Sequence, residues 1–256
     1  MPERRVGNVG GLGVCQMTQP EMQLGGSLSS RPLHFIFIAD CSGSMGVDGK
    51  IQALNTAIRE ALPEMRTVAG ENPNAEVLIR AVAFSNGARW HVATPTPVEQ
   101  FTWPPLEAGG VTDMGAALKE VAAQLKTPPM SERALPPVLV LLSDGQPTDD
   151  FSTGLKELLD QPWARKAVRI AIALGSDADL DPLQQFIGNV ELQPLEAKNA
   201  ADLVRFIKWA STAVLKSASS PGSLLEGKQS ASNVPLPPPP DLVPALDATV
   251  AVGDVW

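Results

Sequence analysis

Short apolar runs that alternate with helix-patterned segments are the feature that most constrains this fold. The runs at 33–39, 138–143 and 168–174 are six or seven residues long, and the first is followed directly by Asp40. Their length, and the aromatic and β-branched content of the first run, predict strands that are buried on both faces, as in a parallel sheet. We therefore expect a mainly parallel sheet at the centre of the molecule.

Between these runs, apolar residues recur at steps of three and four, which is typical of amphipathic helices. The pattern predicts helices at 51–65, 114–125, 151–160 and 181–187, and a closing helix that starts near Asn199. A further strand is expected at 75–84, and Asn86-Gly87 should turn the chain back into an antiparallel edge strand at 89–93. A last short strand is predicted at 190–192. Alternating strands and helices indicate a doubly wound α/β fold with helices on both faces of the sheet.

Composition divides the 256 residues into three segments. Residues 1–31 contain many glycines and are predicted to form an irregular arm. Residues 218–256 hold 7 of the 24 prolines and are predicted to form a flexible tail. The remaining segment, 32–217, is long enough to form one globular domain with its own core. We expect no second domain.

Charge and cysteine content exclude several classes of protein. The net charge of −8 argues against sequence-independent nucleic-acid binding, and no apolar stretch is long enough to span a membrane. The N-terminal residues show no apolar run typical of a secretory signal, so we expect a cytoplasmic protein. Two cysteines, Cys15 and Cys41, cannot build a disulfide framework or a four-ligand zinc site. Cys41 is expected to be buried, and whether the two ever pair is left open.

Oxygen-bearing side chains follow the predicted strands where those strands end. Asp40, Ser42 and Ser44 form a D-x-S-x-S sequence, Asp144 follows the strand at 138–143, and Thr112 precedes a helix. In an open parallel sheet, ligands bind outside the carboxyl ends of the strands. Carboxylate and hydroxyl oxygens suit Mg²⁺, with Mn²⁺ or Ca²⁺ as alternatives, better than zinc or copper. These five residues are the predicted metal ligands.

The same residues resemble the metal-ion-dependent adhesion site (MIDAS) of the von Willebrand factor A (vWA) family. The resemblance covers roughly 32–217 and implies a Rossmann-like, mostly parallel sheet with one antiparallel edge strand. It also implies that Ser42 and Ser44 ligate the metal directly, and that Thr112 and the two aspartates do so directly or through water. Within the family, the segment 142–149 is most similar to bacterial TerY-type proteins, which are associated with tellurite resistance and often linked to a protein kinase and a PP2C-like phosphatase.

A metal held by few anionic ligands keeps an open coordination position, which an Asp or Glu of another protein can fill. We therefore expect an interaction module and not an enzyme. The resemblance to TerY-type proteins implies that it acts as an adaptor in a bacterial stress or signalling system. One alternative is an adaptor subunit of an AAA+ ATPase complex. The other is a Mg²⁺-dependent phosphohydrolase with Asp40 as nucleophile. Enzymes of the haloacid-dehalogenase type carry a second acid two residues later, where this chain has Ser42, and the sequence contains no phosphate-binding P-loop.

Four residues near the predicted site are candidate partner contacts. Trp103 is proposed as an exposed contact because its loop leads toward Thr112, although tryptophan is more often a core anchor. Asp113 is alternatively a first-turn carboxylate favoured by the helix dipole. Thr148 and Asp149 lie near the same edge and alternatively begin the helix at 151–160. His34, at the start of a buried strand, is expected to be a hydrogen-bonded structural histidine.

Overall fold

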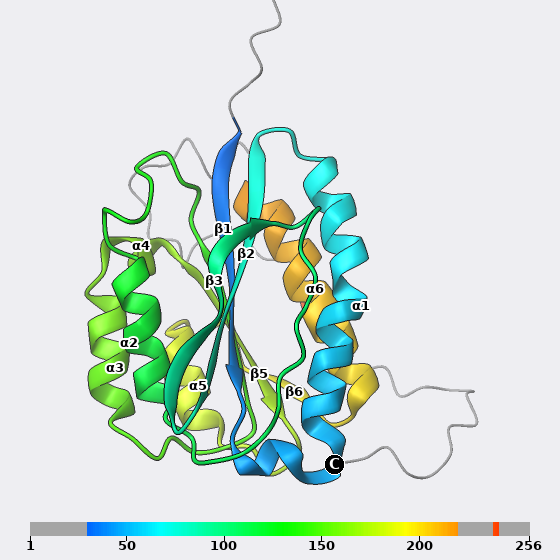
Figure 1. Cartoon of the computed structure of the whole chain (residues 1–256), viewed down its shortest axis with the longest axis vertical. Helices are drawn as coiled ribbons and strands as arrows, with labels where there is room; N and C mark the ends of the chain where they lie inside the picture. The colour runs from blue at the N-terminus through cyan, green and yellow to red at the C-terminus, as the bar shows by residue number, and fades with distance from the viewer. Residues whose placement is uncertain (1–29, 220–237, 241–256) are drawn as a thin grey trace, which may run out of the picture.

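In a computed structural model, which describes residues 30–219 and 238–240, a central sheet is covered by helices on both faces (Figure 1). The six strands lie in the order β3-β2-β1-β4-β5-β6, and every neighbouring pair is parallel except β2 and β3. Their bounds are β1 (Arg31–Asp40), β2 (Ala75–Ser85), β3 (Gly87–Pro97), β4 (Val138–Ser143), β5 (Val168–Leu174) and β6 (Leu195–Ala197). The predicted mostly parallel α/β fold, with its one antiparallel edge strand, is confirmed.

The helices form two layers, one on each face of the sheet. Their bounds are α1 (Lys50–Gly70), α2 (Met114–Gln124), α3 (Phe151–Leu159), α4 (Pro162–Lys166), α5 (Leu180–Ile187) and α6 (Ala200–Ser219), with a 3-10 helix, η1 (Gly43–Gly49), before α1. Residues of α1 and α6 share one core cluster, and residues of α2, α3, α4 and α5 share the other. In the described part of the chain, no helix is both long and apolar enough to cross a membrane.

The central strand β1 explains the continuous apolar run in the sequence. Leu33, Phe35 and Phe37 enter the core cluster under α1 and α6, while Ile36 and Ile38 enter the cluster under α2 to α5. All five side chains are at most 1% exposed. Because successive side chains of a strand point to opposite faces, a strand covered on both sides needs an apolar residue at every position.

One strand lies elsewhere than predicted. The chain forms a turn at 190–191, where a strand was expected, and the Val190 side chain is 87% exposed. The Asn189 Oδ1 atom accepts a hydrogen bond from the Glu191 amide at 2.9 Å, a local turn that competes with an extended backbone. The edge strand β6 forms five residues later than predicted, beside β5.

The predicted domain limits of 32 and 217 lie within the first described strand and the last described helix, and they stay a prediction. Strand β1 begins at Arg31, whose amide donates to the Asn74 carbonyl at 2.9 Å, and α6 ends at Ser219. Apart from residues 30–31, 218–219 and 238–240, the predicted arm at 1–31 and tail at 218–256 lie outside the described residues. Cys15 lies there too.

The order of the strands creates a switch point beside β1. The chain passes from β1 to β2 on one side, and later returns through α2 to β4 on the other. Loops that leave the carboxyl ends of β1 and β4 therefore diverge at this point and leave room between them, which is where open α/β sheets bind ligands. This end of the sheet is at the bottom of Figure 1.

Candidate functional site

Asp40 and Ser143, the last residues of β1 and β4, meet at the switch point. The Ser143 hydroxyl donates a hydrogen bond to Asp40 Oδ2 at 2.5 Å, and the backbone amide of Ser42 donates to Asp40 Oδ1 at 2.7 Å. Asp40 is fully buried. Both of its carboxylate oxygens are thus held by protein donors, which fixes the carboxyl group relative to the following loop.

A second group of oxygens lies next to this pair. The hydroxyls of Ser42 and Ser44 are 2.9 Å apart, and the Ser44 hydroxyl donates to Asp144 Oδ1 at 2.8 Å. The start of η1, where the Met45 amide bonds to the Ser42 carbonyl, folds the chain so that both serine side chains reach the same place. Four of the predicted site residues therefore share one connected cluster.

Thr112 approaches this cluster from the loop before α2. The loop is tied to the D-x-S-x-S segment because the Gly43 amide donates to the Gly110 carbonyl at 3.0 Å. A Cβ atom placed on Gly145 would lie 3.6 Å from Thr112 Oγ1 and 4.0 Å from Ser44 Oγ. The two hydroxyls therefore face the same small space, which the absence of a side chain at Gly145 leaves open.

Burial governs the electrostatics of the cluster. Removal from water raises the pKa of Asp40 above its ordinary value, and the hydrogen bonds from Ser143 and Ser42 act in the opposite direction. Burial also raises the pKa of the neighbouring Cys41 thiol to about 12, so Cys41 is a buried, protonated thiol, as expected. Within the described residues, His, Cys, Asp and Glu side chains form no group of three that could hold a metal. Any cation here would depend on the hydroxyls as well as the two carboxylates.

Sequence reasoning missed Lys50, the first residue of α1. Its ammonium group lies 2.9 Å from Asp144 Oδ2, and the side chains of Lys50 and Asp144 are 6% and 0% exposed. Lys50 precedes Leu54 and Ile58 at helical spacing, so it belongs to the apolar stripe that faces the sheet. A lysine on an otherwise apolar helix stripe is the signal that could have identified a buried ion pair.

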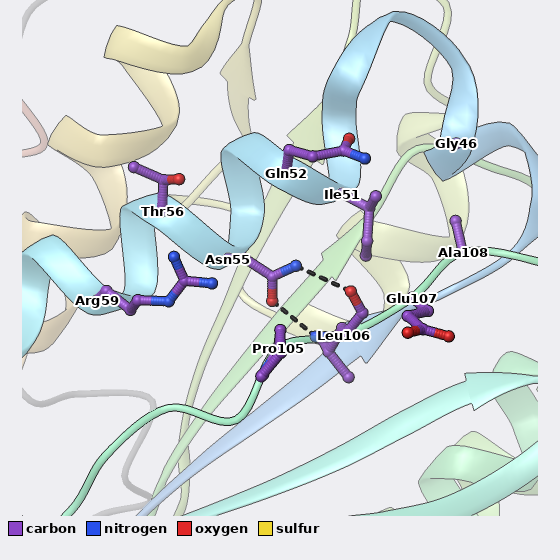
Figure 2. Close-up of a pocket in the computed structure, with 10 residues that line it drawn as sticks. All are labelled: Gly46, Ile51, Gln52, Asn55, Thr56, Arg59, Pro105, Leu106, Glu107 and Ala108. Carbon is purple, nitrogen blue, oxygen red and sulfur yellow. Dashed lines mark hydrogen bonds between the residues drawn. The ribbon is translucent and has the colours of Figure 1, made fainter.

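Trp103 is not an exposed contact, contrary to the prediction. Its side chain is 6% exposed, packs edge-on against Phe37, and donates from Nε1 to Asn55 Oδ1 at 2.9 Å. Asn55, on α1, also bonds to both the amide and the carbonyl of Leu106 (Figure 2). The indole is buried because Asn55 satisfies its polar atom, so Trp103 anchors the long connection between β3 and α2.

An open groove lies beside this anchor, between α1 and the segment 105–108 (Figure 2). Its lining is mixed polar and apolar: Gly46, Ile51, Gln52, Asn55, Thr56, Arg59, Pro105, Leu106, Glu107 and Ala108. None of the five predicted metal ligands lines it, so the groove and the oxygen cluster are separate features.

Asp113 and Thr148 hold loops together next to the cluster. Asp113 occupies the N-cap position of α2 without a side-chain cap, because its Oδ2 accepts from the Gly87 amide at 2.7 Å. Its Oδ1 accepts from the Thr148 hydroxyl at 3.1 Å, and that hydroxyl accepts from the Thr112 amide at 3.0 Å. These bonds orient the Thr112 loop.

Asp149 caps a different helix from the one considered in the sequence. Its two oxygens accept hydrogen bonds from the Gly115 and Ala116 amides, in the first turn of α2. The next residue, Asp150, caps α3 instead, since its side chain accepts a hydrogen bond from the Thr153 amide. These bonds lower the pKa of Asp150 to about 2.

His34 is buried without the full hydrogen bonding that was expected. Its Nδ1 atom has no partner in the structure, and the side chain is 9% exposed. Burial, together with the nearby positive charge of Arg80, lowers the pKa of His34 to about 4. The imidazole is therefore neutral near pH 7 and plays no part in the oxygen cluster.

Comparison with known proteins places this geometry in a family. A search of curated proteins finds no match. Among solved structures, a von Willebrand factor type A protein from Catenulispora acidiphila is 19% identical with a TM-score of 0.55, covering 73% of this chain and 43% of that one. The pilus adhesin SpaC from Lactobacillus rhamnosus GG is 13% identical with a TM-score of 0.59. The match covers 74% of this chain and 31% of the adhesin.

Proximal thread matrix protein 1 from the mussel byssus, solved with zinc in its MIDAS motif, is 18% identical with a TM-score of 0.56, covering 71% of this chain and 48% of that one. This chain thus spans less than half the length of each of the three structures, and the likeness at these identities is one of fold. The family model of the von Willebrand factor type A domain matches residues 35–196, and the chain therefore belongs to that family.

Proposed function

We propose that the oxygen cluster of Asp40, Ser42, Ser44, Thr112 and Asp144 is a MIDAS that binds one divalent cation, Mg²⁺ in the first place. Through that cation it binds an acidic side chain of a partner protein. Domains of this family commonly mediate metal-dependent interactions between proteins. The observation that carries the proposal is the spacing of the oxygens of Ser42, Ser44 and Asp144.

That spacing fits a small octahedral ion. Adjacent ligands of Mg²⁺, at metal–oxygen distances of about 2.0–2.1 Å, lie about 2.9 Å apart. The Ser42–Ser44 and Ser44–Asp144 oxygen distances are 2.9 and 2.8 Å. The space that Gly145 leaves open is bordered by Thr112 and Ser44. The residues present therefore fit the cation.

The donor chemistry favours a hard cation. The cluster offers hydroxyl and carboxylate oxygens, whereas the thiol of the adjacent Cys41 donates to the Ala39 carbonyl at 3.8 Å. Oxygen donors favour Mg²⁺, Mn²⁺ or Ca²⁺. The zinc in the MIDAS motif of the mussel protein supports divalent binding by this fold without deciding the ion. A bound cation would supply an electrophilic centre with a coordination position open to a carboxylate.

Apolar side chains around the cluster suit a protein partner. Val47, in η1, and Val111, beside Thr112, are 55% and 46% exposed. They are two of the three large hydrophobic side chains that the described residues expose, the third being Val190. An acidic residue of a partner, flanked by apolar residues, would match this surface better than a free small anion would.

The alternative of a phosphohydrolase finds little support in the geometry. Asp40 is fully buried, and both of its oxygens accept hydrogen bonds, from Ser42 and Ser143, so the carboxylate is not presented to a substrate phosphate. The second acid that such enzymes need is replaced by Ser42. We expect no turnover of a generic phosphate ester in the presence of Mg²⁺.

In its finer form, the proposal is a cytoplasmic, TerY-type adaptor that works with a protein kinase and a PP2C-like phosphatase. It rests on the similarity of the segment 142–149 to proteins of that type. Co-purification in Mg²⁺, with loss of the partners in EDTA, tests it. Recovery of a hexameric AAA+ ATPase instead would favour the alternative adaptor role.

Titration calorimetry with Mg²⁺ and Mn²⁺ tests the metal site. We expect one site per chain, lost in Ser42→Ala and in Asp144→Asn. Ser152→Ala is the matched control, because Ser152 is exposed and bonds only within the cap of α3. Wild-type binding that persists unchanged in both site variants would contradict the proposal, as would no binding at all.

A further inference from the structure

Lys50 is a buried cation at the edge of the proposed metal site. Its ammonium group bonds to Asp144 Oδ2 at 2.9 Å, while the other oxygen of the same carboxylate accepts from Ser44 at 2.8 Å. One carboxylate therefore separates the ammonium group from the hydroxyls that face the cation. At this depth, water screens little of the charge.

Among the described residues, the ammonium group of Lys50 forms one ion pair besides that with Asp144, and it is the weaker of the two. Asp177 Oδ1 lies 3.7 Å away, but its side chain is 79% exposed, so solvent weakens that contact. On the remaining side, a Cβ atom on Gly175 would come within 3.1 Å of the nitrogen, which shows that the backbone is closely packed there. The fixed partner of Lys50 is thus Asp144.

We infer that Lys50 is a built-in counter-ion that lowers the affinity of the cluster for the cation and raises the affinity of the occupied cluster for an acidic ligand. The inference rests on the proposed metal site. Lys50 lies outside the proposed metal ligands, which are the D-x-S-x-S residues, Thr112 and Asp144. By its charge it shifts binding free energy from the cation to the acidic ligand.

The argument follows from counting charges. A metal is held by deprotonated ligands, so in the occupied cluster Asp40 and Asp144 contribute two negative charges and Lys50 one positive charge. A divalent cation then leaves a single net positive charge. Without Lys50 the same occupied cluster would be neutral. The surplus positive charge attracts an acidic side chain and raises its affinity for the occupied cluster. Repulsion by Lys50 lowers the affinity of the cluster for the cation. Lys50 also holds Asp144 Oδ2, leaving Oδ1 toward the serine hydroxyls.

Lys50→Met tests the inference, since methionine keeps an unbranched stem without the charge. Lys156→Met is the matched control: it changes the net charge equally, and Lys156 is exposed in a surface pair with Asp160. We expect calorimetry with Mn²⁺ to give about tenfold or more tighter binding for Lys50→Met, and wild-type binding for the control. Thermal unfolding in EDTA first establishes that each variant is folded.

The second measurement addresses the acidic ligand, with acetate as the probe. Acetate is titrated into protein saturated with Mn²⁺, and displacement of bound water is followed by water-proton relaxation. We expect Lys50→Met to need a several-fold higher acetate concentration than wild type or Lys156→Met.

The outcomes separate the two proposals. If wild type binds Mn²⁺ and the affinity of Lys50→Met is unchanged or lower, or if that variant binds acetate equally well or more tightly, the inference is overturned and the metal site stays in place. Absence of Mn²⁺ binding in both proteins overturns the proposed function, and the inference with it. Tighter Mn²⁺ binding together with weaker acetate binding in Lys50→Met supports both.

Discussion

The carboxylate of Asp149 accepts a hydrogen bond from the backbone amide of Gly115 at 2.8 Å, joining the loop after β4 to the first turn of α2. Its other oxygen accepts from the Ala116 amide at 2.7 Å. An acidic side chain that caps a helix N-terminus gains from both the free amides and the helix dipole. Here the cap comes from a distant segment, and it fixes the helix that follows Thr112.

Replacement of Asp149 by alanine should therefore destabilise the domain and loosen the Thr112 loop. We expect the free energy of unfolding to fall by about 1–2 kcal/mol in urea titrations, because two helix amides lose their acceptor. Glu132→Ala removes the same charge from an exposed loop position and should change it little. Equal stability of the two variants would show that the cap contributes nothing.

A methyl group at Gly145 should weaken cation binding without unfolding the protein. The added Cβ of Gly145→Ala would be in ordinary contact with Thr112 Oγ1 and Ser44 Oγ, at 3.6 and 4.0 Å, so the fold has room for it. It would, however, fill the space the two hydroxyls face. We expect urea titration to show a change within about 1 kcal/mol and calorimetry to show at least about tenfold weaker Mg²⁺ binding. Unchanged Mg²⁺ affinity would place the cation elsewhere.

Gly154 should tolerate no side chain. A Cβ there would overlap the Gly115 carbonyl oxygen, so α2 and α3 would have to separate. We expect Gly154→Ala to lower the free energy of unfolding by about 1–3 kcal/mol, the usual range for overpacking. At Gly70, near the end of α1, a Cβ would meet nothing within 4 Å. Gly70→Ala should therefore be neutral or stabilising, and a similar loss in both variants would contradict the close helix approach.

His34 should make the domain acid-sensitive. The unfolded chain binds a proton at this residue below about pH 6.5, whereas the folded protein, with its pKa of about 4, does not. Stability from this residue is therefore complete above about pH 6.5 and is lost as the pH falls toward 4, by roughly 3 kcal/mol in total. His34→Leu should flatten this part of the profile in urea titrations between about pH 7 and pH 4.5.

Sequence patterns predicted the strands β4 and β5 with their observed limits, since short and largely apolar runs suit the interior of a sheet covered on both faces. The five oxygen-bearing residues could also be chosen in advance. Each follows a strand or precedes a helix at the same end of a parallel sheet, so topology alone brings them near one another. The cation itself stays a prediction.

The remaining features depend on contacts that no local pattern encodes. Trp103 is buried because Asn55, 48 residues earlier, accepts its N–H group. Lys50 is buried because Asp144, 94 residues later, neutralises it. The misplaced strand at 190–192 has a simpler cause, a short turn at Asn189 that apolar content alone does not reveal.

The bonds from Ser143 to Asp40 and from Ser44 to Asp144 join positions 103 and 100 residues apart. No fragment that stops short of β4 can present all the oxygens, and a nascent chain gains them only once the middle of the sheet has closed. Long-range pairings of this kind form late, because the intervening chain must first lose its freedom. Binding of a divalent ion at this cluster would thus require that the two halves of the domain have come together. A chain still being synthesised would not bind partners through this site.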